Sequence, residues 1–278
     1  MGDVLLGTGS ALSKYELKRY YERIFPNVYV PKPWTPSLRD RTAAAWLWSG
    51  RRGVIAGAAA AALHGANWVD ATTPVELIWD NGRPPSGLVV RNETYAADEV
   101  TKVAGIPVTT KARTAFDLAR LLPRDEAVAR LDALKRATAF KKEDVLRIAA
   151  RHPGARGLKA LRIALPLVDG GAASPKETWL RLLLIDAGLP APTTQIPVVE
   201  GRGKLVRMLD MGWEEFMVGA EYDGDQHRTD RYQYAKDVRV KRKLTTLGWN
   251  VTYVIKEDRP DEVVKSVWDA MVSRGWRP

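Results

Sequence analysis

Residues Lys204–Arg228 read KLVRMLDMGWEEFMVGAEYDGDQHR, and the elements predicted around them depend on how this segment folds. Its apolar residues form two runs around a short turn at Glu214–Glu215, so the pattern predicts a β-hairpin. A purely structural hairpin has no use for ionisable side chains within such runs. The stretch nevertheless carries, among others, Asp210, Glu221, Asp223 and His227. The hairpin is therefore the first candidate for a functional site.

The three acids of the hairpin are expected on one face of the sheet. Positions two apart in a strand share a face, so Glu221 and Asp223 point the same way. With the turn centred on Glu214–Glu215, Asp210 lies opposite Gly219 and diagonal to Glu221. Buried like charges repel and raise one another's pKa unless a cation lies among them. Mg²⁺ is the simplest such ion, and Mn²⁺ accepts the same oxygen ligands.

The same arrangement suits phosphodiester hydrolysis. A metal held by Asp210, Glu221 and Asp223 would lower the pKa of a bound water and offset charge on the phosphate. His227, just past the second strand, is a candidate general base. Two of these residues also have a purely structural interpretation, because Asp-Gly at 223–224 is a common turn pair and a histidine suits a surface position. Asp210 is harder to explain in this way, since an acid in a central strand is costly without a partner.

The residues around the hairpin predict an α/β fold. Ser174 at the N-cap, Pro175 at the first helical position and Glu177 at the third indicate a helix start. Glu177 either closes this capping box or points toward the sheet, because it shares a helix face with Leu180 and Leu184. Further elements are predicted as a strand over 195–199, a basic helix over 232–247, a strand over 249–255 and a helix over 261–274. A mixed sheet with helices on both faces follows.

Spaced motifs in this part of the chain occur in the order of a known family. They are the strand Asp210, the run Glu221-Tyr222-Asp223-Gly224-Asp225-Gln226-His227, and Leu244-Thr245-Thr246-Leu247-Gly248-Trp249 after a basic helix, preceded by Ser174-Pro175, Glu177, Gly188-Leu189-Pro190 and Gln195. Over residues 174–278 this pattern resembles the very-short-patch-repair-like branch of the PD-(D/E)xK endonuclease superfamily.

That resemblance implies a restriction-endonuclease-like fold and Mg²⁺-dependent DNA cleavage, with Asp210 and Glu221 as metal ligands. The chain departs from the superfamily at one position, because Asp223 stands where a lysine is usual. The group that activates water is therefore left open among His227, Lys236 from the next helix, and a second metal.

The N-terminal part begins with helices and a short strand that carry many basic residues. Ser13 and Glu16 form a capping-box pattern that opens a helix to about Ile24, a strand over 27–30 follows, and further helices begin near Ser37 and Gly57. This order suggests a helix-turn-helix-like or winged-helix-like module over residues 1–70. The basic residues expected to contact nucleic acid, here and in the C-terminal part, are Lys14, Lys18, Arg19, Arg51, Arg52, Arg228, Lys236, Arg239 and Lys243. The alternative is that they lie on the solvated faces of amphipathic helices.

Residues 71–170 change to strands and then back to helices, which predicts an α+β connecting region. Small residues and turns recur in the runs Ile55-Ala56-Gly57-Ala58-Ala59-Ala60, Leu63-His64-Gly65, Gly105-Ile106-Pro107-Val108-Thr109-Thr110 and Arg113-Thr114-Ala115-Phe116-Asp117-Leu118. This pattern is similar to AbiEi-type antitoxin and regulator proteins of abortive infection, which begin with a DNA-binding winged helix. The resemblance implies that DNA is the partner.

Length and composition narrow the classes of protein. The small flexible run at 169–173 divides the 278 residues, and the change from helices to strands after residue 70 gives a second boundary. Domains are therefore predicted over 1–70, 71–170 and 174–278. A formal net charge of +10 favours a polyanionic partner such as nucleic acid. The absence of cysteine excludes disulfides and thiolate zinc sites. No apolar run is long enough to span a bilayer, so we expect a cytoplasmic protein without a membrane partner.

Two functions follow from the sequence, and its charge also leaves open a third, an enzyme that acts on RNA or free nucleotides. The first is a metal-dependent DNA endonuclease or nickase, in which the front binds DNA and the back hydrolyses phosphodiester bonds. Its catalytic set would be Asp210, Glu221, Asp223, His227 and Glu177. The second is an antitoxin-like DNA-binding transcriptional regulator with an inactive nuclease fold. The presence of all the acids and the histidine favours the enzyme, while the sequence indicates neither a recognition site nor an oligomeric state.

Overall fold

The computed structural model describes residues 4–7, 12–224 and 231–278, with the side chains of residues 231–234 excepted. The chain forms two compact units, Met1–Val168 and Asp169–Pro278, and each is described by itself. The division falls at the start of the small-residue run at 169–173. His227 and Arg228, both candidates in the sequence, lie outside the described residues.

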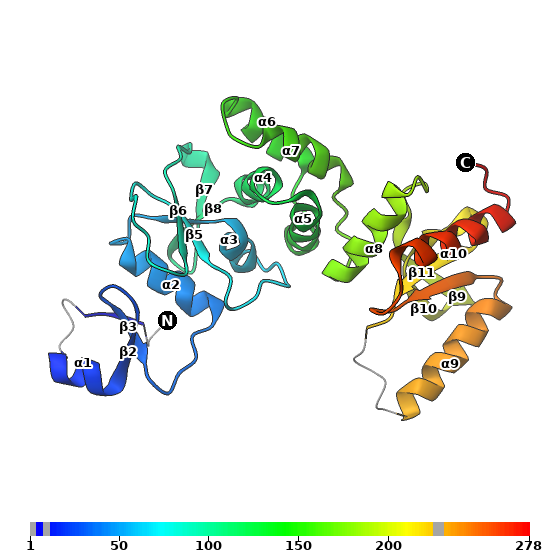
Figure 1. The fold of residues 1–278 in the computed structure, drawn as a ribbon, viewed down its shortest axis with the longest axis horizontal. Coiled ribbons are helices and arrows are strands. Elements are labelled where there is room, and N and C mark those ends of the chain that lie inside the picture. Colours follow the sequence, from blue (N-terminus) through cyan, green and yellow to red (C-terminus); the bar gives the residue numbers. More distant parts are fainter. Residues whose placement is uncertain (1–3, 8–11, 225–230) are drawn as a thin grey trace. The chain divides into compact units, whose positions relative to one another are not determined.

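The first unit is built on a five-stranded mixed sheet with the order β6-β5-β4-β8-β7 (Figure 1). Its strands are β4 (Val54–Ala56), β5 (Val75–Ile78), β6 (Leu88–Arg91), β7 (Val100–Val103) and β8 (Ile106–Thr109), with the short helix η1 (Ala97–Glu99) before β7. The pairs β4–β8 and β5–β6 are parallel, and the other two are antiparallel. This sheet forms a core with α2 (Leu38–Trp48) and α3 (Gly57–Leu63).

A second core in this unit lies among helices. They are α4 (Lys111–Leu121), α5 (Arg124–Thr138), α6 (Lys142–Arg151), α7 (Leu158–Ala164) and the short η2 (Leu165–Leu167). The alanine-rich α3 belongs to both cores, because Ala59 and Ala60 pack with the sheet and Ala61 packs with the helices. Small side chains let the helix approach neighbours on all sides. The Gly57–Ala61 segment is accordingly buried throughout.

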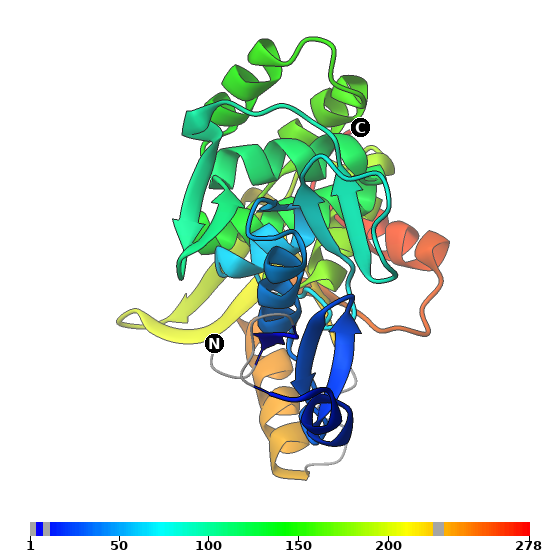
Figure 2. The same cartoon turned by 90° about the vertical axis from the view of Figure 1, so that its left-hand side faces the viewer.

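The start of the chain forms a three-stranded sheet with the order β1-β3-β2. Its elements are β1 (Leu5–Leu6), α1 (Lys14–Tyr20), β2 (Tyr21–Phe25) and β3 (Val28–Pro31), and α1 lies beside the β2–β3 hairpin (Figure 2). The predicted capping box of Ser13 and Glu16 is confirmed. The helix ends at Tyr20 rather than near Ile24, because residues 21–25 pair with β3 instead. The assignment of this region as a winged helix stays a prediction.

The second unit is the predicted α/β layout, a mixed sheet with the order β12-β11-β10-β9. Its elements are α8 (Pro175–Asp186), β9 (Thr193–Glu200), β10 (Lys204–Trp213), η3 (Glu214–Phe216), β11 (Val218–Tyr222), α9 (Arg231–Thr246), β12 (Asn250–Val254) and α10 (Pro260–Ser273). β9, β10 and β11 are antiparallel, while β12 runs parallel to β11.

Helices cover both faces of this sheet, as the sequence predicted. On one face α8 and α10 pack against Met211, Trp213 and Val218. On the other, Leu244 of α9 packs against Ile196 and Leu209. None of the helices that the structure describes combines the length and the apolarity needed to cross a membrane.

Candidate functional site

The predicted hairpin forms, with a register that differs from the prediction. Met211 pairs with Ala220 and Gly212 with Gly219, so Asp210 is not opposite Gly219. The connection is longer than a tight turn, because η3 is followed by Met217 in a left-handed conformation with φ of 54°. The difference is two residues, which leaves the alternation of faces unchanged.

Asp210 lies among other carboxylates and is largely buried. Its Oδ2 accepts a hydrogen bond of 2.9 Å from the backbone N–H of Tyr222, on the neighbouring strand. Burial, followed by the charge of Glu177 and then that of Glu221, raises the pKa of Asp210 to about 7, and the Tyr222 hydrogen bond and the charge of Arg207 oppose this rise. The pKa of Asp210, on β10, therefore depends on residues of α8 and β11.

Glu177 does more than cap its helix. The N-cap Ser174 accepts from the Glu177 backbone N–H at 3.2 Å, as predicted. The Glu177 carboxylate is buried, and its Oε2 accepts from the Ala173 N–H at 2.7 Å and from Gln195 Nε2 at 3.5 Å. The prediction that Glu177 points inward is confirmed, since the side chain contacts a residue of β9.

Glu221 is paired with an arginine that the sequence analysis did not single out. Arg207 Nε donates to Glu221 Oε1 at 2.8 Å, and Arg207 Nη2 donates to Oε2 at 3.0 Å. Burial raises the pKa of the Glu221 carboxyl, while the hydrogen bonds and charge of Arg207 lower it in part. The available signal was a basic residue within an apolar strand, three positions before Asp210.

Beside this pair is a pocket of about 140 Å³ that Asp223 also lines. Lys241 of α9 reaches into it, with its Nζ 3.3 Å from Asp223 Oδ2 and 3.8 Å from the centroid of the Tyr253 ring. Burial raises the pKa of the Tyr253 hydroxyl. The lysine near Asp223 is thus Lys241, whereas the predicted Lys236 is exposed and is not among the residues that line this pocket.

Asp210, Glu221 and Asp223 are the side chains that would have to hold a divalent cation. Carboxylates are the right kind of ligand for Mg²⁺. Within residues 4–7, 12–224 and 231–278, however, no group of three His, Cys, Asp or Glu side chains is arranged to hold a metal ion. Each oxygen of Glu221 accepts a hydrogen bond from the Arg207 guanidinium, whose positive charge opposes the approach of a second cation. In this arrangement the residues do not fit the metal centre expected from Asp210, Glu221 and Asp223.

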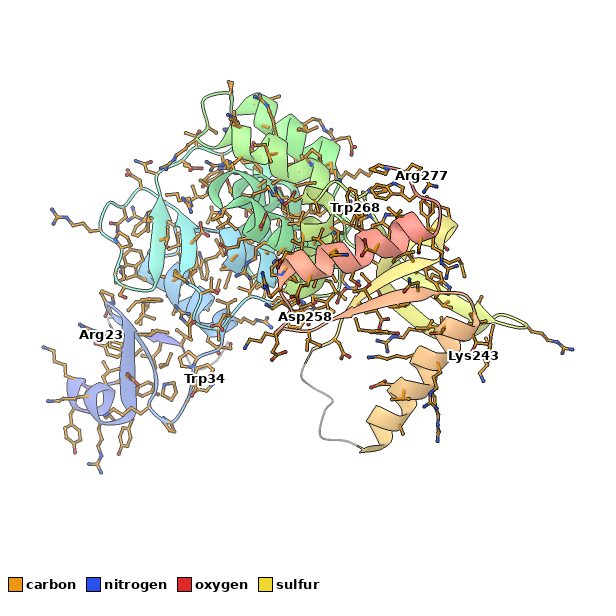
Figure 3. The ribbon with its side chains drawn as sticks, turned by 45° about the vertical axis from the view of Figure 1, so that its right-hand side comes forward. Arg23, Trp34, Lys243, Asp258, Trp268 and Arg277 are labelled. Atoms are coloured by element: carbon orange, nitrogen blue, oxygen red, sulfur yellow. The ribbon has the colours of Figure 1, made fainter. Side chains whose placement is uncertain are left out.

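The predicted nucleic-acid contacts lie in three places. Lys14, Lys18 and Arg19 are exposed on α1, and the Arg19 guanidinium lies 5.8 Å from the Tyr15 ring and 5.4 Å from the Tyr20 ring. Those elsewhere are the exposed Arg51 and Arg52 after α2, the exposed Lys236 and Arg239 on α9, and Lys243 at the end of α9, which is labelled in Figure 3 and pairs with Glu200.

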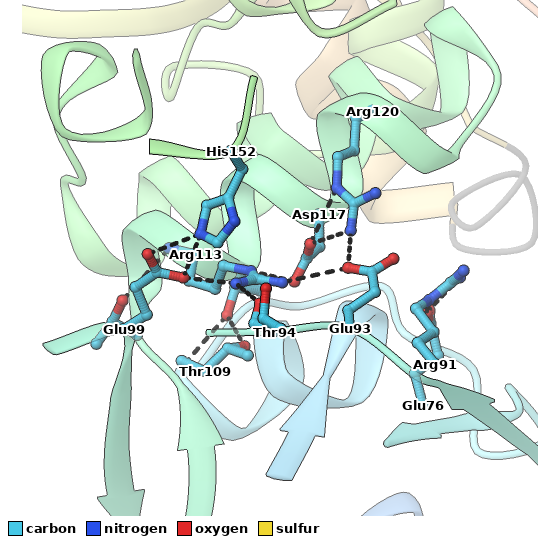
Figure 4. A network of polar contacts seen from close by, with 12 residues as sticks. Glu76, Arg91, Glu93, Thr94, Glu99, Thr109, Arg113, Asp117, Arg120 and His152 are labelled. Carbon is cyan, nitrogen blue, oxygen red and sulfur yellow. Dashed lines mark hydrogen bonds and ion pairs between the residues drawn. The ribbon is translucent and has the colours of Figure 1, made fainter. Parts of the chain in front are cut away.

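A separate polar cluster lies inside the first unit (Figure 4). Arg113, only 1% exposed, donates from Nε to Asp117 and from Nη1 and Nη2 to Glu99 and Glu93. Arg120 also pairs with Asp117 and Glu93. This cluster joins α4 to the segment before β7, and it lies on the Arg113–Leu118 run of the sequence.

The matches to known proteins cover different parts of the chain. Residues 53–167 match the family described as the AbiEi antitoxin C-terminal domain, which spans the five-stranded sheet and the helices α3 to α7. Two curated proteins of Mycobacterium tuberculosis, each titled an uncharacterized protein, are 32% identical to the chain over 239 residues. They are MT2308 of strain CDC 1551 / Oshkosh and Rv2248 of strain ATCC 25618 / H37Rv.

The alignment with these relatives covers 85% of this chain and 86% of each of them. Its 239 residues exceed the 168 of the first unit, so the relatives share residues of both units. The AbiEi match ends at residue 167, before the unit in which the endonuclease resemblance lies. No solved structure matches the chain significantly.

Proposed function

This chain belongs to the family of the two Mycobacterium tuberculosis relatives, and we propose that it is a DNA-binding regulator of the antitoxin type. The observation that carries the proposal is the match of residues 53–167 to the AbiEi antitoxin C-terminal domain. The net charge of +10 supports a polyanionic partner. The regulator alternative from the sequence is thereby favoured over the endonuclease.

The surface best suited to DNA in the first unit is α1. Leu17 is buried and anchors the helix, while Lys14, Lys18 and Arg19 are exposed beside it. Tyr15 is 66% exposed, and its hydroxyl accepts from Arg19 Nη1 at 2.6 Å, which holds the guanidinium at the surface. Cations presented in this way contact phosphates and position a protein on a duplex.

Reversing the charge of α1 is expected to weaken DNA binding. The variant is the triple substitution Lys14→Glu, Lys18→Glu and Arg19→Glu, with binding of a labelled mixed-sequence duplex followed by fluorescence anisotropy at several salt concentrations. The loss of three phosphate contacts would make the negative slope of log K, the association constant, against log salt less steep by about 2.7. We expect the affinity to fall at least about tenfold at low salt.

A matched control separates this surface from net charge. Lys102, Lys159 and Arg162 are exposed residues of the same unit, and replacing all three by glutamate changes the charge equally. The control variant is expected to keep most of the salt slope. Equal losses in the two variants would show that only overall charge matters, and undiminished binding by the α1 variant would place the DNA surface elsewhere.

A second candidate function is a Mg²⁺-dependent DNA endonuclease, and one observation favours it. Asp210 is partly buried and lies close enough to Glu177 and Glu221 for their charges to raise its pKa, an electrostatic conflict that a divalent cation would relieve. Glu221 would have to exchange Arg207 for the metal in such an enzyme. The two candidate functions therefore differ in the role of Arg207.

If the endonuclease function holds, the wild-type protein is expected to nick supercoiled plasmid in Mg²⁺ and not in EDTA. Asp210→Asn and Glu221→Gln should each lose nicking, because they remove a carboxylate with little change of shape. Glu214→Gln, an exposed acid in the hairpin connection, serves as the matched control and should nick normally. Nicking that persists in both site variants would point to a contaminating nuclease.

A further inference from the structure

Glu177, Asp210 and Glu221 form an acidic cluster in the second unit. We infer that the Arg207 guanidinium supplies the positive charge of this cluster, so that the carboxylates stay together without a divalent metal. The inference goes beyond the proposed regulator function, because it concerns the second unit alone and does not depend on DNA binding by the first. It also assigns a role to a residue that the metal-centre hypothesis leaves out.

The geometry of the ion pair supports this role. Glu221 on β11 has a side chain that is only 4% exposed, and its two oxygens each accept a hydrogen bond from the guanidinium of Arg207 on β10. A bidentate arginine–carboxylate pair is stronger and more directional than a single charged contact. The positive guanidinium lies against both oxygens, so it already supplies the charge that a metal ion would bring and would repel a second cation there.

The other two acids also have partners from the chain itself. Asp210 accepts the backbone N–H of Tyr222, and Glu177 accepts the backbone N–H of Ala173. The first donor is the last residue of β11, and the second lies in the segment that leads into α8. Each of the three carboxylates therefore has a hydrogen bond that folding alone supplies.

Exchange of Arg207 for a metal ion is unfavourable both for Glu221, which loses its ion pair, and for the metal, which loses water ligands. Breaking the pair leaves the buried Glu221 without its counter-ion until the metal has lost part of its hydration shell. Mg²⁺ releases its waters reluctantly and requires near-octahedral oxygen ligands. Arginine stays charged at every physiological pH, so the pair does not open by deprotonation. The structure thus favours retention of Arg207 over capture of a metal.

The inference is tested by Mn²⁺ binding to the full chain in the absence of DNA, measured from the free-ion signal in electron paramagnetic resonance. Wild type and Glu221→Gln are expected to give the same weak isotherm through the millimolar range. Arg207→Met should bind Mn²⁺ at least about tenfold more tightly than wild type, because it frees the Glu221 carboxylate. Combining Arg207→Met with Glu221→Gln should remove that gain.

Arg202→Met is the matched control, since Arg202 is exposed in the turn before β10 and its loss changes the net charge equally. It should bind Mn²⁺ like wild type. The inference is overturned if wild type binds Mn²⁺ about tenfold more tightly than Glu221→Gln, or if Arg207→Met, folded by circular dichroism, shows no gain. Should Arg207→Met fail to fold, the comparison of wild type with Glu221→Gln decides by itself. DNA binding plays no part in these outcomes.

Discussion

Replacement of Asp210 by asparagine is expected to stabilise the second unit at pH 8 and to leave its stability almost unchanged near pH 4. Burial raises the pKa of Asp210 from 3.8 to about 7 in the folded protein, with the charge of Glu177 as the next cause. Asparagine removes the charge and keeps an oxygen that can accept the Tyr222 N–H. The variant therefore avoids the penalty that the ionised acid carries.

The sign of the pH dependence follows from linkage. Below about pH 4 the acid is protonated in both the folded and the unfolded states, so the shifted pKa has no effect. Between pH 4 and 7 the unfolded state loses its proton first, and wild type becomes progressively less stable relative to Asp210→Asn. Above pH 7 the difference is complete and is on the order of 4 kcal/mol, since one pKa unit corresponds to about 1.36 kcal/mol.

The measurement is urea unfolding of wild type and variant from pH 4 to pH 8. Because the chain has two units, the transition of the second is assigned by hydrogen exchange of β10 and β11. Asp269→Asn is the control, as Asp269 is 62% exposed and pairs with Lys265 at the surface. It should change stability by less than about 1 kcal/mol at any pH. A variant at Asp210 no more stable than wild type at pH 8 would contradict the raised pKa.

Replacement of Arg113 by methionine is expected to destabilise the first unit by about 3–5 kcal/mol, the range for breaking a buried ion pair from one side. Arg113 is 1% exposed, and its loss leaves Glu99 (0% exposed) and Asp117 (2% exposed) without their shared partner. Burial already raises the pKa of Asp117, and the charges of Arg113 and Arg120 oppose that effect. The penalty arises from the carboxylates left behind.

Two further variants show whether the interpretation is right. Arg147→Met removes an arginine that pairs with Asp144 at the surface, and it should cost less than about 1 kcal/mol. Adding Asp117→Asn to Arg113→Met should recover part of the lost stability, because it removes one stranded charge. Urea unfolding of the first unit measures all three. A loss for Arg113→Met no larger than that for Arg147→Met would exclude a structural role for the buried cluster.

The first and the second unit point to different functions. Residues 53–167 of the first unit match the AbiEi antitoxin C-terminal domain, and α1 of the same unit offers a basic surface. The second unit has the mixed sheet expected from the endonuclease resemblance, but its acids are held by Arg207 and by backbone N–H groups. A mixed α/β unit whose acids are held in this way is compatible with a regulator, because a fold does not determine a function.

Local features of this chain were determined by the sequence alone. Ser13, Ser37 and Ser174 each cap the helix that was predicted to begin there, because a cap depends on residues three positions apart. The apolar runs on either side of Glu214 form antiparallel strands as predicted, since alternation acts within a strand. The mixed sheet with helices on both faces follows from the order of such elements.

Only the tertiary structure decided which side chains meet. Arg207 on β10 contacts Glu221 on the neighbouring strand β11, 14 positions further along the chain, and Lys241 on α9 contacts Asp223, 18 positions before it. No local sequence pattern encodes contacts between residues so far apart. The end of α1 and the register of the hairpin were likewise decided by pairing with neighbours. The acids at 177, 210 and 221 were visible in the sequence, whereas the cation that balances one of them depends on three-dimensional packing.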